Sequence, residues 1–395
     1  MRIALLTHAF PPDNEHGIPR YVYELANALG KRNHCVEVIA GCPEAGRNPE
    51  RTENFNINWV HQSPSFSKYT PVYGQLKLSY RIRKTLLALH REQPFDIVEF
   101  PNYKLSGFAS AVHGLPKPSP AFISRLSSPG SVIPKSGISP WRLGEVFEKF
   151  QVRKLSGVIG NTADNLAICQ KAYNLDPNLP KTVILHGLPA GTAPKLHYNH
   201  PCRNIGLFLG RIEPRKGFDT LATAWDLVVK KVPDARLLVA GVDQPWKGHD
   251  SYFSYCLSNL PPKTLKQIEY LGFVGAETKE QLLAGCDIFI APSRYESFGL
   301  VFLEAMRYGK PVISCRTGGI PNVVSHGNTG LLVPTEDAHE LALAIIDLFA
   351  DNTRRQKYGN NAVEVVLKKF SQERVAIESD SFYAQLTKRI GDSDS

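Results

Sequence analysis

Strand-like and helix-like segments alternate along the whole chain. In the first half, short apolar runs typical of buried strands are separated by segments whose apolar residues recur at helical spacing. Because strands that alternate with helices need crossovers to pair, this pattern predicts a parallel sheet with helices on both faces. The predicted strands are 2–7, 35–40, 95–100, 120–125, 157–161 and 182–185, and the predicted helices are 21–30, 74–92 and 104–113.

The alternation restarts after a linker. Residues 187–202 are rich in Gly, Pro, Asn and His and have no periodicity, as is typical of a connection between domains. The fold class is therefore α/β, with two doubly wound Rossmann-like domains, 1–195 and 196–371, facing across a cleft in which ligands bind beyond the carboxyl ends of the strands. Strands are predicted at 205–210, 236–241, 268–273, 287–292 and 311–315, helices at 218–231, 279–285, 300–308, 336–349, 352–369 and 372–390, and a frayed tail at 391–395.

The composition excludes several classes of protein. With 395 residues, 43% of them hydrophobic and 21% charged, the chain is neither disordered nor a coiled coil nor a disulfide-stabilised miniprotein. Its apolar runs are far shorter than the roughly 20 residues of a membrane helix. The seven cysteines form no CxxC pair and their number is odd, so we expect reduced thiols in a cytoplasmic protein.

The positive charge is concentrated in the first half. Residues 1–195 hold 23 Lys and Arg against 14 Asp and Glu, whereas 196–395 hold 23 of each. A solvated basic face would explain this, and so would an anionic partner: a membrane surface or a phosphate-bearing acceptor. The segment 74–89 is predicted to be an amphipathic helix with a basic side, which can lie on anionic lipid. Nucleic acid is not expected, because no RRM, KH or zinc-finger pattern is present.

The densest cluster of candidate residues is 294–313. Glu296 and Glu304 flank a junction at which a strand leads into a helix that begins near Leu300. Free N–H groups at such a helix start favour an anion, such as a diphosphate, and Gly299 lets a ligand approach the backbone closely. Glu296 is placed to accept hydrogen bonds from vicinal hydroxyls. Taken alone, two glutamates at this spacing are more often plain helix charges.

Two other strand ends carry candidates. Arg211 and Lys216 lie in the loop after strand 205–210, where two cations suit a diphosphate and would stabilise charge on a phosphate leaving group. Gly17 lies between strand 2–7 and the next helix, where it could let the backbone approach a phosphate or could simply form a turn.

Together these segments resemble the retaining GT-B glycosyltransferases of family 4, the group 1 sugar transferases. The resemblance rests on the E-x7-E pair Glu296/Glu304, the GR…RKG element with Arg211 and Lys216, TGGIPNVV (317–324) and HGNTGLLV (326–333), and it covers nearly the whole chain. It implies transfer of a sugar from a nucleotide donor with retention at the anomeric carbon, and no metal or other cofactor. It also implies that the helix 372–390 packs back onto the first domain.

The resemblance also assigns roles to residues. Arg211 and Lys216 would hold the donor diphosphate while the acceptor attacks on the same face, and Glu304 would bind the ribose and Glu296 the sugar hydroxyls. Gly17 would cap the diphosphate from the first domain. Further donor contacts would come from Ser297, Phe298, Gly299, Leu300 and Val301 at the helix start, and from Phe273 and Val274 beside the base.

The first half departs from the family pattern where the acceptor would bind. Many members of the family carry two adjacent glycines in the loop after the first strand, and here a histidine stands in place of the first. Many members also carry a histidine after the strand that corresponds to 95–100, where this chain has the sequence EFPNY, 99–103. Glu99, Asn102 or Tyr103 would take that role, and Ser127 stands where relatives often have histidine. The candidates for the acceptor or sugar side, against loop or core packing, are His16, Asn102, Tyr103 and Arg125.

On this basis the sequence predicts a hexosyltransferase that uses a UDP-sugar, with glucose favoured. Its acceptor would be a hydroxyl of a glycan or a lipid-linked molecule in surface polysaccharide or glycolipid synthesis. It would act in the cytoplasm, including the inner face of the cell membrane. A nucleotide-sugar 2-epimerase of the same fold and a non-catalytic sugar-nucleotide-binding protein stay open as alternatives. A dehydrogenase is disfavoured because GxGxxG is absent.

Overall fold

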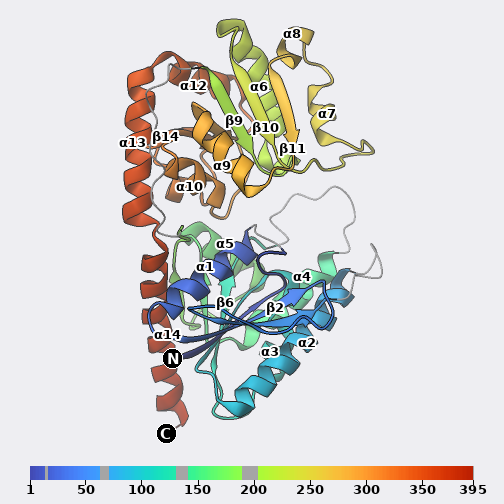
Figure 1. Cartoon of the computed structure of the whole chain (residues 1–395), viewed down its shortest axis with the longest axis vertical. Coiled ribbons are helices and arrows are strands. Elements are labelled where there is room, and N and C mark those ends of the chain that lie inside the picture. The colour runs from blue at the N-terminus through green and yellow to red at the C-terminus, as the bar shows by residue number, and fades with distance from the viewer. Residues whose placement is uncertain (14–16, 63–70, 130–140, 189–202, 395) are drawn as a thin grey trace. The chain divides into compact units, whose positions relative to one another are not determined.

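The computed structural model describes residues 1–13, 17–62, 71–129, 141–188 and 203–394. They belong to two compact units, one comprising Met1–Pro189 with Ser371–Ser395 and the other Ala190–Phe370 (Figure 1). The boundary expected at 195/196 falls in 189–202, outside the described residues.

The first unit is built on an eight-stranded sheet with the order β3-β4-β2-β1-β5-β6-β7-β8. All neighbouring strands pair in parallel except the short edge strand β3, which is antiparallel to β4. Because β2 lies on one side of β1 and β5 on the other, the winding of the chain reverses between β1 and β5. The strands are β1 (Arg2–Thr7), β2 (Cys35–Cys42), β3 (Glu50–Arg51), β4 (Asn56–His61), β5 (Ile97–Pro101), β6 (Ala121–Leu126), β7 (Gly157–Gly160) and β8 (Lys181–Val183).

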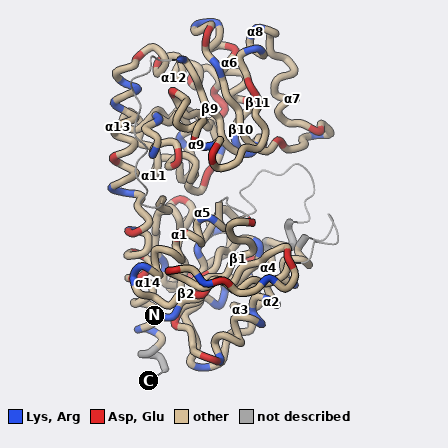
Figure 2. The backbone as a smooth tube through the Cα atoms, viewed as in Figure 1, with Lys and Arg blue, Asp and Glu red and all other residues tan. Residues whose placement is uncertain are grey.

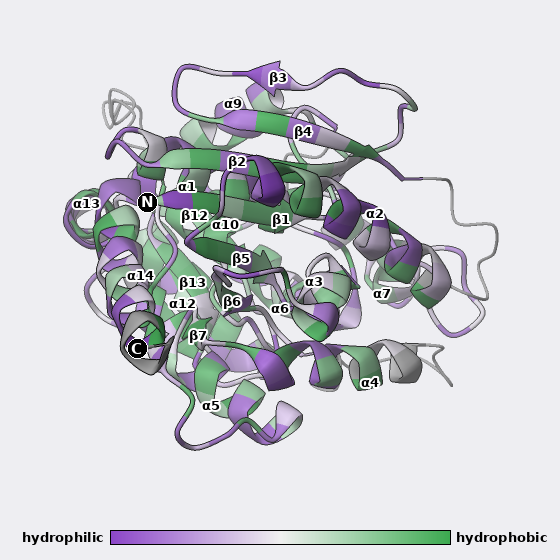
Figure 3. Ribbon diagram, turned by 90° about the horizontal axis from the view of Figure 1, so that it is seen from below, coloured by the Kyte–Doolittle hydropathy of each residue, from purple (hydrophilic) through white to green (hydrophobic). Residues whose placement is uncertain are grey.

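Helices cover both faces of this sheet, as predicted. Successive side chains of a strand point to opposite faces, so Ile3 and Leu5 enter one hydrophobic core while Ala4 and Leu6 enter another. The strands β1 and β5 are accordingly hydrophobic in Figure 3. The first core is completed by α1 (Ile18–Gly30) and α14 (Gln372–Asp394), and the second by α2 (Pro71–Glu92), α3 (Phe108–His113) and α5 (Ala163–Tyr173).

The second unit holds a six-stranded parallel sheet with the order β11-β10-β9-β12-β13-β14. Here the winding reverses between β9 and β12. Side chains of β9, α6 and α12 share one core, in which Trp225 is fully buried. The strands are β9 (Ile205–Leu209), β10 (Arg236–Ala240), β11 (Ile268–Gly272), β12 (Ile288–Ala291), β13 (Val312–Cys315) and β14 (Gly330–Val333), and the helices are α6 (Phe218–Lys231), α7 (Tyr252–Leu257), α8 (Pro262–Leu265), α9 (Ala276–Gly285), α10 (Leu300–Arg307), α11 (Ile320–Val323), α12 (Ala338–Ala350) and α13 (Asn352–Lys369).

Two expectations about the chain's elements are wrong. The helix predicted at 104–113 is split into a 3-10 turn, η1 (Tyr103–Leu105), and α3, because Lys104 and Leu105 both have left-handed backbone angles, with φ of 56° and 57°. The tail was expected to fray, but the helical backbone of α14 continues to Asp394. None of the described helices is long and apolar enough to cross a membrane.

Candidate active site

The loops that follow β9 and β12 meet at the point where the second sheet reverses its winding. The two strands pair in parallel, Gly206 with Ile288 and Leu207 with Phe289, so their carboxyl ends lie at the same edge. The N–H of Arg294 in one loop donates to the carbonyl of Arg215 in the other at 2.8 Å. Open sheets of this kind bind ligands at this place.

The Glu296 carboxylate lies at the centre of this contact. The Lys216 ammonium donates to its Oε1, and Arg215 donates to its Oε2 at 3.2 Å. The hydroxyl of Ser293 also reaches Oε1, at 3.3 Å. Since only 8% of Glu296 is exposed, these partners replace the water that an ionised carboxylate would otherwise bind.

Charge pairing decides the ionisation of this cluster. Burial opposes the ionised form of Glu296, but the attraction of Lys216 and Arg215 outweighs it, and the pKa of the carboxyl lies below its ordinary value. Burial also disfavours the charged form of Lys216, and for a cation this lowers the pKa of the ammonium group. The carboxylate is therefore ionised at neutral pH and suited to accept hydrogen bonds from hydroxyl groups.

Arg215 is a member of the cluster that sequence analysis missed. Besides Glu296, its guanidinium binds the carboxylate of Glu213 at 2.8 and 3.1 Å and the carbonyl of Tyr295 at 3.0 Å. It thereby ties the two loops together. Its place directly before Lys216 in the RKG element was the available clue.

Arg211 is placed differently from Lys216. Its side chain is 57% exposed and lies 3.3 Å from the Glu213 carboxylate, whereas the ammonium of Lys216 pairs directly with Glu296. The two residues that were predicted to bind the diphosphate therefore pair with different carboxylates of the cluster. More than half of the Arg211 side chain stays exposed and can contact a ligand.

The start of α10 carries the other predicted donor residues of this loop. Gly299 caps the helix with φ of 89°, and a β-carbon there would lie 2.4 Å from the ring of Phe302, so both conformation and space require glycine. Phe298 is buried, and Ser297, which precedes the cap, is half-buried. Leu300 and Val301 are half-buried in the first turn, where backbone N–H groups lack the i−4 helical acceptor.

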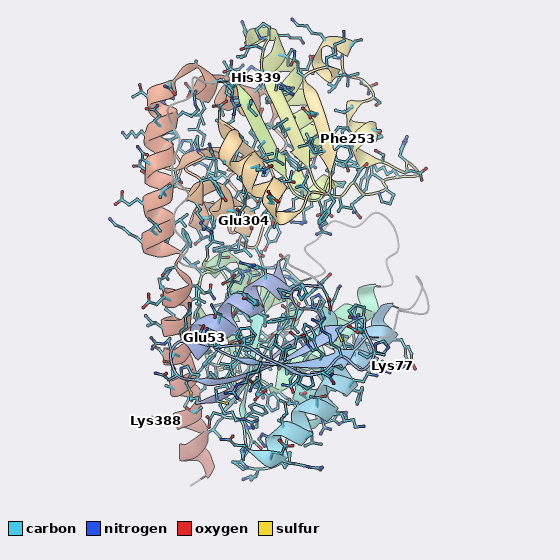
Figure 4. The ribbon with its side chains drawn as sticks, viewed as in Figure 1. Glu53, Lys77, Phe253, Glu304, His339 and Lys388 are labelled. Carbon is cyan, nitrogen blue, oxygen red and sulfur yellow. The ribbon has the colours of Figure 1, made fainter. Side chains whose placement is uncertain are left out.

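Glu304 lies one turn further along α10. Its carboxylate pairs with the ammonium of Lys279 on α9 at 2.8 Å, and the side chain is labelled in Figure 4. Both groups are more than a quarter exposed, so the pair is open to exchange with a polar ligand. Sequence analysis predicted Glu304 but not its partner.

The loop after β11 presents an aromatic side chain. Phe273 is 63% exposed and Val274 half-buried, directly after Gly272 with its φ of 67°. An exposed aromatic at the carboxyl end of a strand is suited to packing against a planar base. The role of these two residues stays a prediction.

The structure places the predicted site residues of the first unit differently. His16 lies outside the described residues, and Gly17 caps α1 with φ of 56° and open space around it. Asn102 is buried, and its side chain is satisfied there: its amide nitrogen donates to the hydroxyl of Tyr173 at 2.7 Å, and its oxygen accepts from the backbone N–H and the hydroxyl of Ser127 at 2.7 and 2.9 Å. Tyr103 is half-buried, with its ring against that of His8.

Arg125 is a core residue. It is 3% exposed and forms a two-point ion pair with Glu99, at 2.8 and 3.3 Å. It also donates to the hydroxyl of Ser379 on α14 at 2.9 Å, and Tyr383 of α14 donates to the same carboxylate. The contacts of Arg125 are those expected of a residue that packs α14 onto the sheet, which was the alternative to acceptor binding.

Within the described ranges, no three His, Cys, Asp or Glu residues lie together so that they could hold a metal ion.

Two family descriptions match the chain. Residues 16–188 match glycosyltransferase family 4, and residues 199–365 match the group 1 glycosyl transferases. The two matches account for both halves of the sequence, in the order expected for GT-B enzymes.

The chain belongs to the group 1, family 4 glycosyltransferases.

Individual relatives agree with this membership. A glycogen synthase of Mycobacterium tuberculosis is 24% identical over 97% of this chain and 94% of its own length. An uncharacterized glycosyltransferase of Methanocaldococcus jannaschii is 30% identical, but the match spans 57% of this chain and 61% of that protein.

Solved structures share the GT-B fold of this transferase. The sucrose-phosphate synthase of Thermosynechococcus elongatus superposes with a TM-score of 0.80 at 22% identity, over 98% of this chain and all of its own. HepE of Anabaena, solved in complex with UDP and glucose, gives a TM-score of 0.69 at 18% identity over 98% of this chain and all of its own. The chain is thus a hexosyltransferase with the GT-B fold.

Proposed function

We propose that this transferase moves glucose from UDP-glucose to a hydroxyl group of a glycan or lipid-linked acceptor, with retention at the anomeric carbon and without a metal. The observation that carries the proposal is the buried cluster of Glu296, Lys216 and Arg215, where β9 and β12 end. Cations fixed beside a carboxylate are what a diphosphate sugar needs: positive charge for its phosphates and an acceptor for its hydroxyls. HepE, which was solved with UDP and with glucose, supports the choice of UDP-glucose.

Charge stabilisation provides the chemistry in this proposal. As the bond between the anomeric carbon and the phosphate oxygen breaks, negative charge grows on the diphosphate, where Lys216 and Arg211 stabilise it. The acceptor oxygen bonds to the anomeric carbon on the same face, and its proton passes to the departing phosphate oxygen. The cations do the electrostatic work of a metal ion.

Glu296 acts in this scheme by positioning the sugar. Its carboxylate is held by Lys216, Arg215 and Ser293, so it is a weaker nucleophile than a free carboxylate. The same partners keep it ionised, as an acceptor for two neighbouring hydroxyls must be.

The test uses water as the acceptor. The purified protein is incubated with UDP-glucose in EDTA, and the glucose released is followed by proton NMR before its anomers equilibrate. The proposal predicts UDP and α-glucose as the first products, with loss of both in Lys216→Met. Release of β-glucose would contradict retention, and a requirement for metal would contradict the charge scheme. Binding of UDP-glucose without turnover would favour the non-catalytic alternative. Release of a sugar whose configuration at C2 has changed would favour the 2-epimerase.

A further inference from the structure

The first sheet also reverses its winding at one point, between β1 and β5. The strands pair in parallel, with Ile3 opposite Ile97 and Leu5 opposite Glu99, so their carboxyl ends share an edge. His8 follows β1, while Tyr103 and Lys104 follow β5. This is the position in the first unit at which an open sheet binds its ligand.

His8 is a buried polar residue in need of a partner. It is 6% exposed, and its Nδ1 has no hydrogen-bond partner among the described residues. Burial, and then the charge of Lys104, lowers the pKa of the imidazole to about 3, so the ring is neutral at physiological pH. Its edge meets the ring of Tyr103, with 5.8 Å between the ring centres. Buried polar atoms usually have a partner, and a bound ligand can supply it.

The backbone at Lys104 is held in an unfavourable conformation. Lys104 and Leu105 have φ of 56° and 57°, which residues with a β-carbon rarely adopt. Hydrogen bonds of Asn102 to Tyr173 and Ser127 fix one end of the turn, and the fully buried Leu105 fixes the other. Strain that neighbours enforce in this way is concentrated at functional sites.

The Lys104 side chain carries a positive charge at a half-buried position. Its ammonium lies 5.6 Å from the centre of the Tyr103 ring, and within the described parts of the chain no carboxylate pairs with it. Burial alone lowers the pKa of this half-buried lysine, which shows that it is partly desolvated without the compensation that an anion would give.

We propose that His8, Tyr103 and Lys104 bind a phosphate group carried by the acceptor. Lys104 supplies the charge, and the buried imidazole supplies a neutral hydrogen-bonding nitrogen beside it. The inference rests on the proposed function in that the phosphate belongs to the molecule that receives the sugar. A soluble sugar phosphate and a membrane phospholipid both carry this group.

The test measures phosphate binding without any transfer. Glucose 6-phosphate and vesicles of phosphatidic acid in phosphatidylcholine are titrated into the full chain by calorimetry, with UDP present to occupy the donor site. The variant Lys104→Asn removes the charge but keeps a residue that tolerates the left-handed conformation, and Lys104→Arg keeps the charge. Lys388→Asn, at an exposed lysine of α14 labelled in Figure 4, is the matched control.

We expect binding to be at least tenfold weaker in Lys104→Asn, and Lys104→Arg and Lys388→Asn to bind like the wild type. The tighter of the two probes identifies the source of the phosphate. His8→Phe, which keeps a ring but loses the nitrogen, should also bind more weakly while keeping its melting temperature. Equal binding by Lys104→Asn and wild type, or no binding of either probe by folded protein, would overturn the inference. Failure of UDP binding, with phosphate binding intact, would contradict only the proposed function.

Discussion

At the scale of single residues, the site depends on a carboxylate that is ionised although it is buried. Glu296 was predictable from its spacing to Glu304, and Lys216 from its place after a strand. Their mutual pairing was not predictable, because the partners are 80 positions apart in sequence and meet only when β9 and β12 pair. The strained pair Lys104–Leu105 was missed for a related reason, since only the anchoring of both its ends forces it out of the helix predicted there.

The ionised state of Glu296 gives a pH dependence of stability. The folded pKa lies below the ordinary value of 4.5, so the pair stabilises the fold above that pH and the stabilisation is lost as the pH falls through the folded value. The free energy of unfolding of wild type should therefore exceed that of Glu296→Gln at pH 7, and the difference should shrink between pH 5 and pH 3.

Urea unfolding at several pH values measures this difference, with Glu277→Gln, an exposed carboxylate on α9, as the control. If the difference in free energy of unfolding between wild type and Glu296→Gln stays constant down to pH 3, pairing of the Glu296 carboxylate with Lys216 and Arg215 does not stabilise the fold.

At the scale of elements, helix α14 is joined to the first sheet by a buried charge network. Arg125 and Glu99 lie on the neighbouring strands β6 and β5, and Ser379 and Tyr383 reach them from α14. The helix itself was predictable from its apolar spacing. The network was not predictable, because the sequence around Arg125 is equally compatible with ligand binding and with packing in the core.

Replacing Arg125 by Met should leave the Glu99 carboxylate buried without its cation. Breaking such a pair costs about 3–5 kcal/mol, so the first unit should unfold at clearly lower urea concentration. Arg374→Gln removes a partly exposed ion pair with Glu378 within α14, and about 0–1 kcal/mol is expected there. Similar losses in the two variants would contradict the structural role of Arg125.

Several elements were not predicted. The strand β4 and the helices α4 (Trp141–Gln151) and α5 were missing from the sequence-based assignment. The strand β4 lies next to the short edge strand β3, where its alternating Asn residues bind Glu37 of the next strand instead of entering a core. The long, strongly periodic helices α6 and α13 were placed correctly, because many buried contacts reinforce their pattern.

At the scale of the whole molecule, the excess positive charge of the first half includes a basic face on α2, whose Lys and Arg residues are blue in Figure 2. Tyr73 and Tyr80 on this helix are 68% and 50% exposed, and Lys77, Lys84 and Arg91 are exposed at helical spacing with them. We propose that this face binds an anionic membrane surface, because aromatic and basic residues on one helix face suit lipid headgroups.

Sedimentation with vesicles tests this surface. Wild type should bind phosphatidylglycerol vesicles and not pure phosphatidylcholine, and Lys77→Glu with Lys84→Glu should reduce binding about tenfold or more, at roughly 1 kcal/mol for each basic residue near the surface. The control, Lys171→Glu with Lys181→Glu, makes the same change of charge at exposed positions of α5 and β8. Equal loss in both double variants would indicate a general charge effect and not a docking face.

Calorimetric titration in EDTA tests whether the second unit binds a nucleotide sugar at the cations beside Glu296. UDP-glucose, UDP, GDP-mannose and GDP are titrated into wild type, Lys216→Met and Lys231→Met, an exposed lysine of α6 that serves as the control. We expect the uridine ligands to bind without metal, at least tenfold more weakly to Lys216→Met and with unchanged affinity to Lys231→Met. Binding of UDP-glucose with equal affinity by Lys216→Met and wild type would contradict binding at these cations.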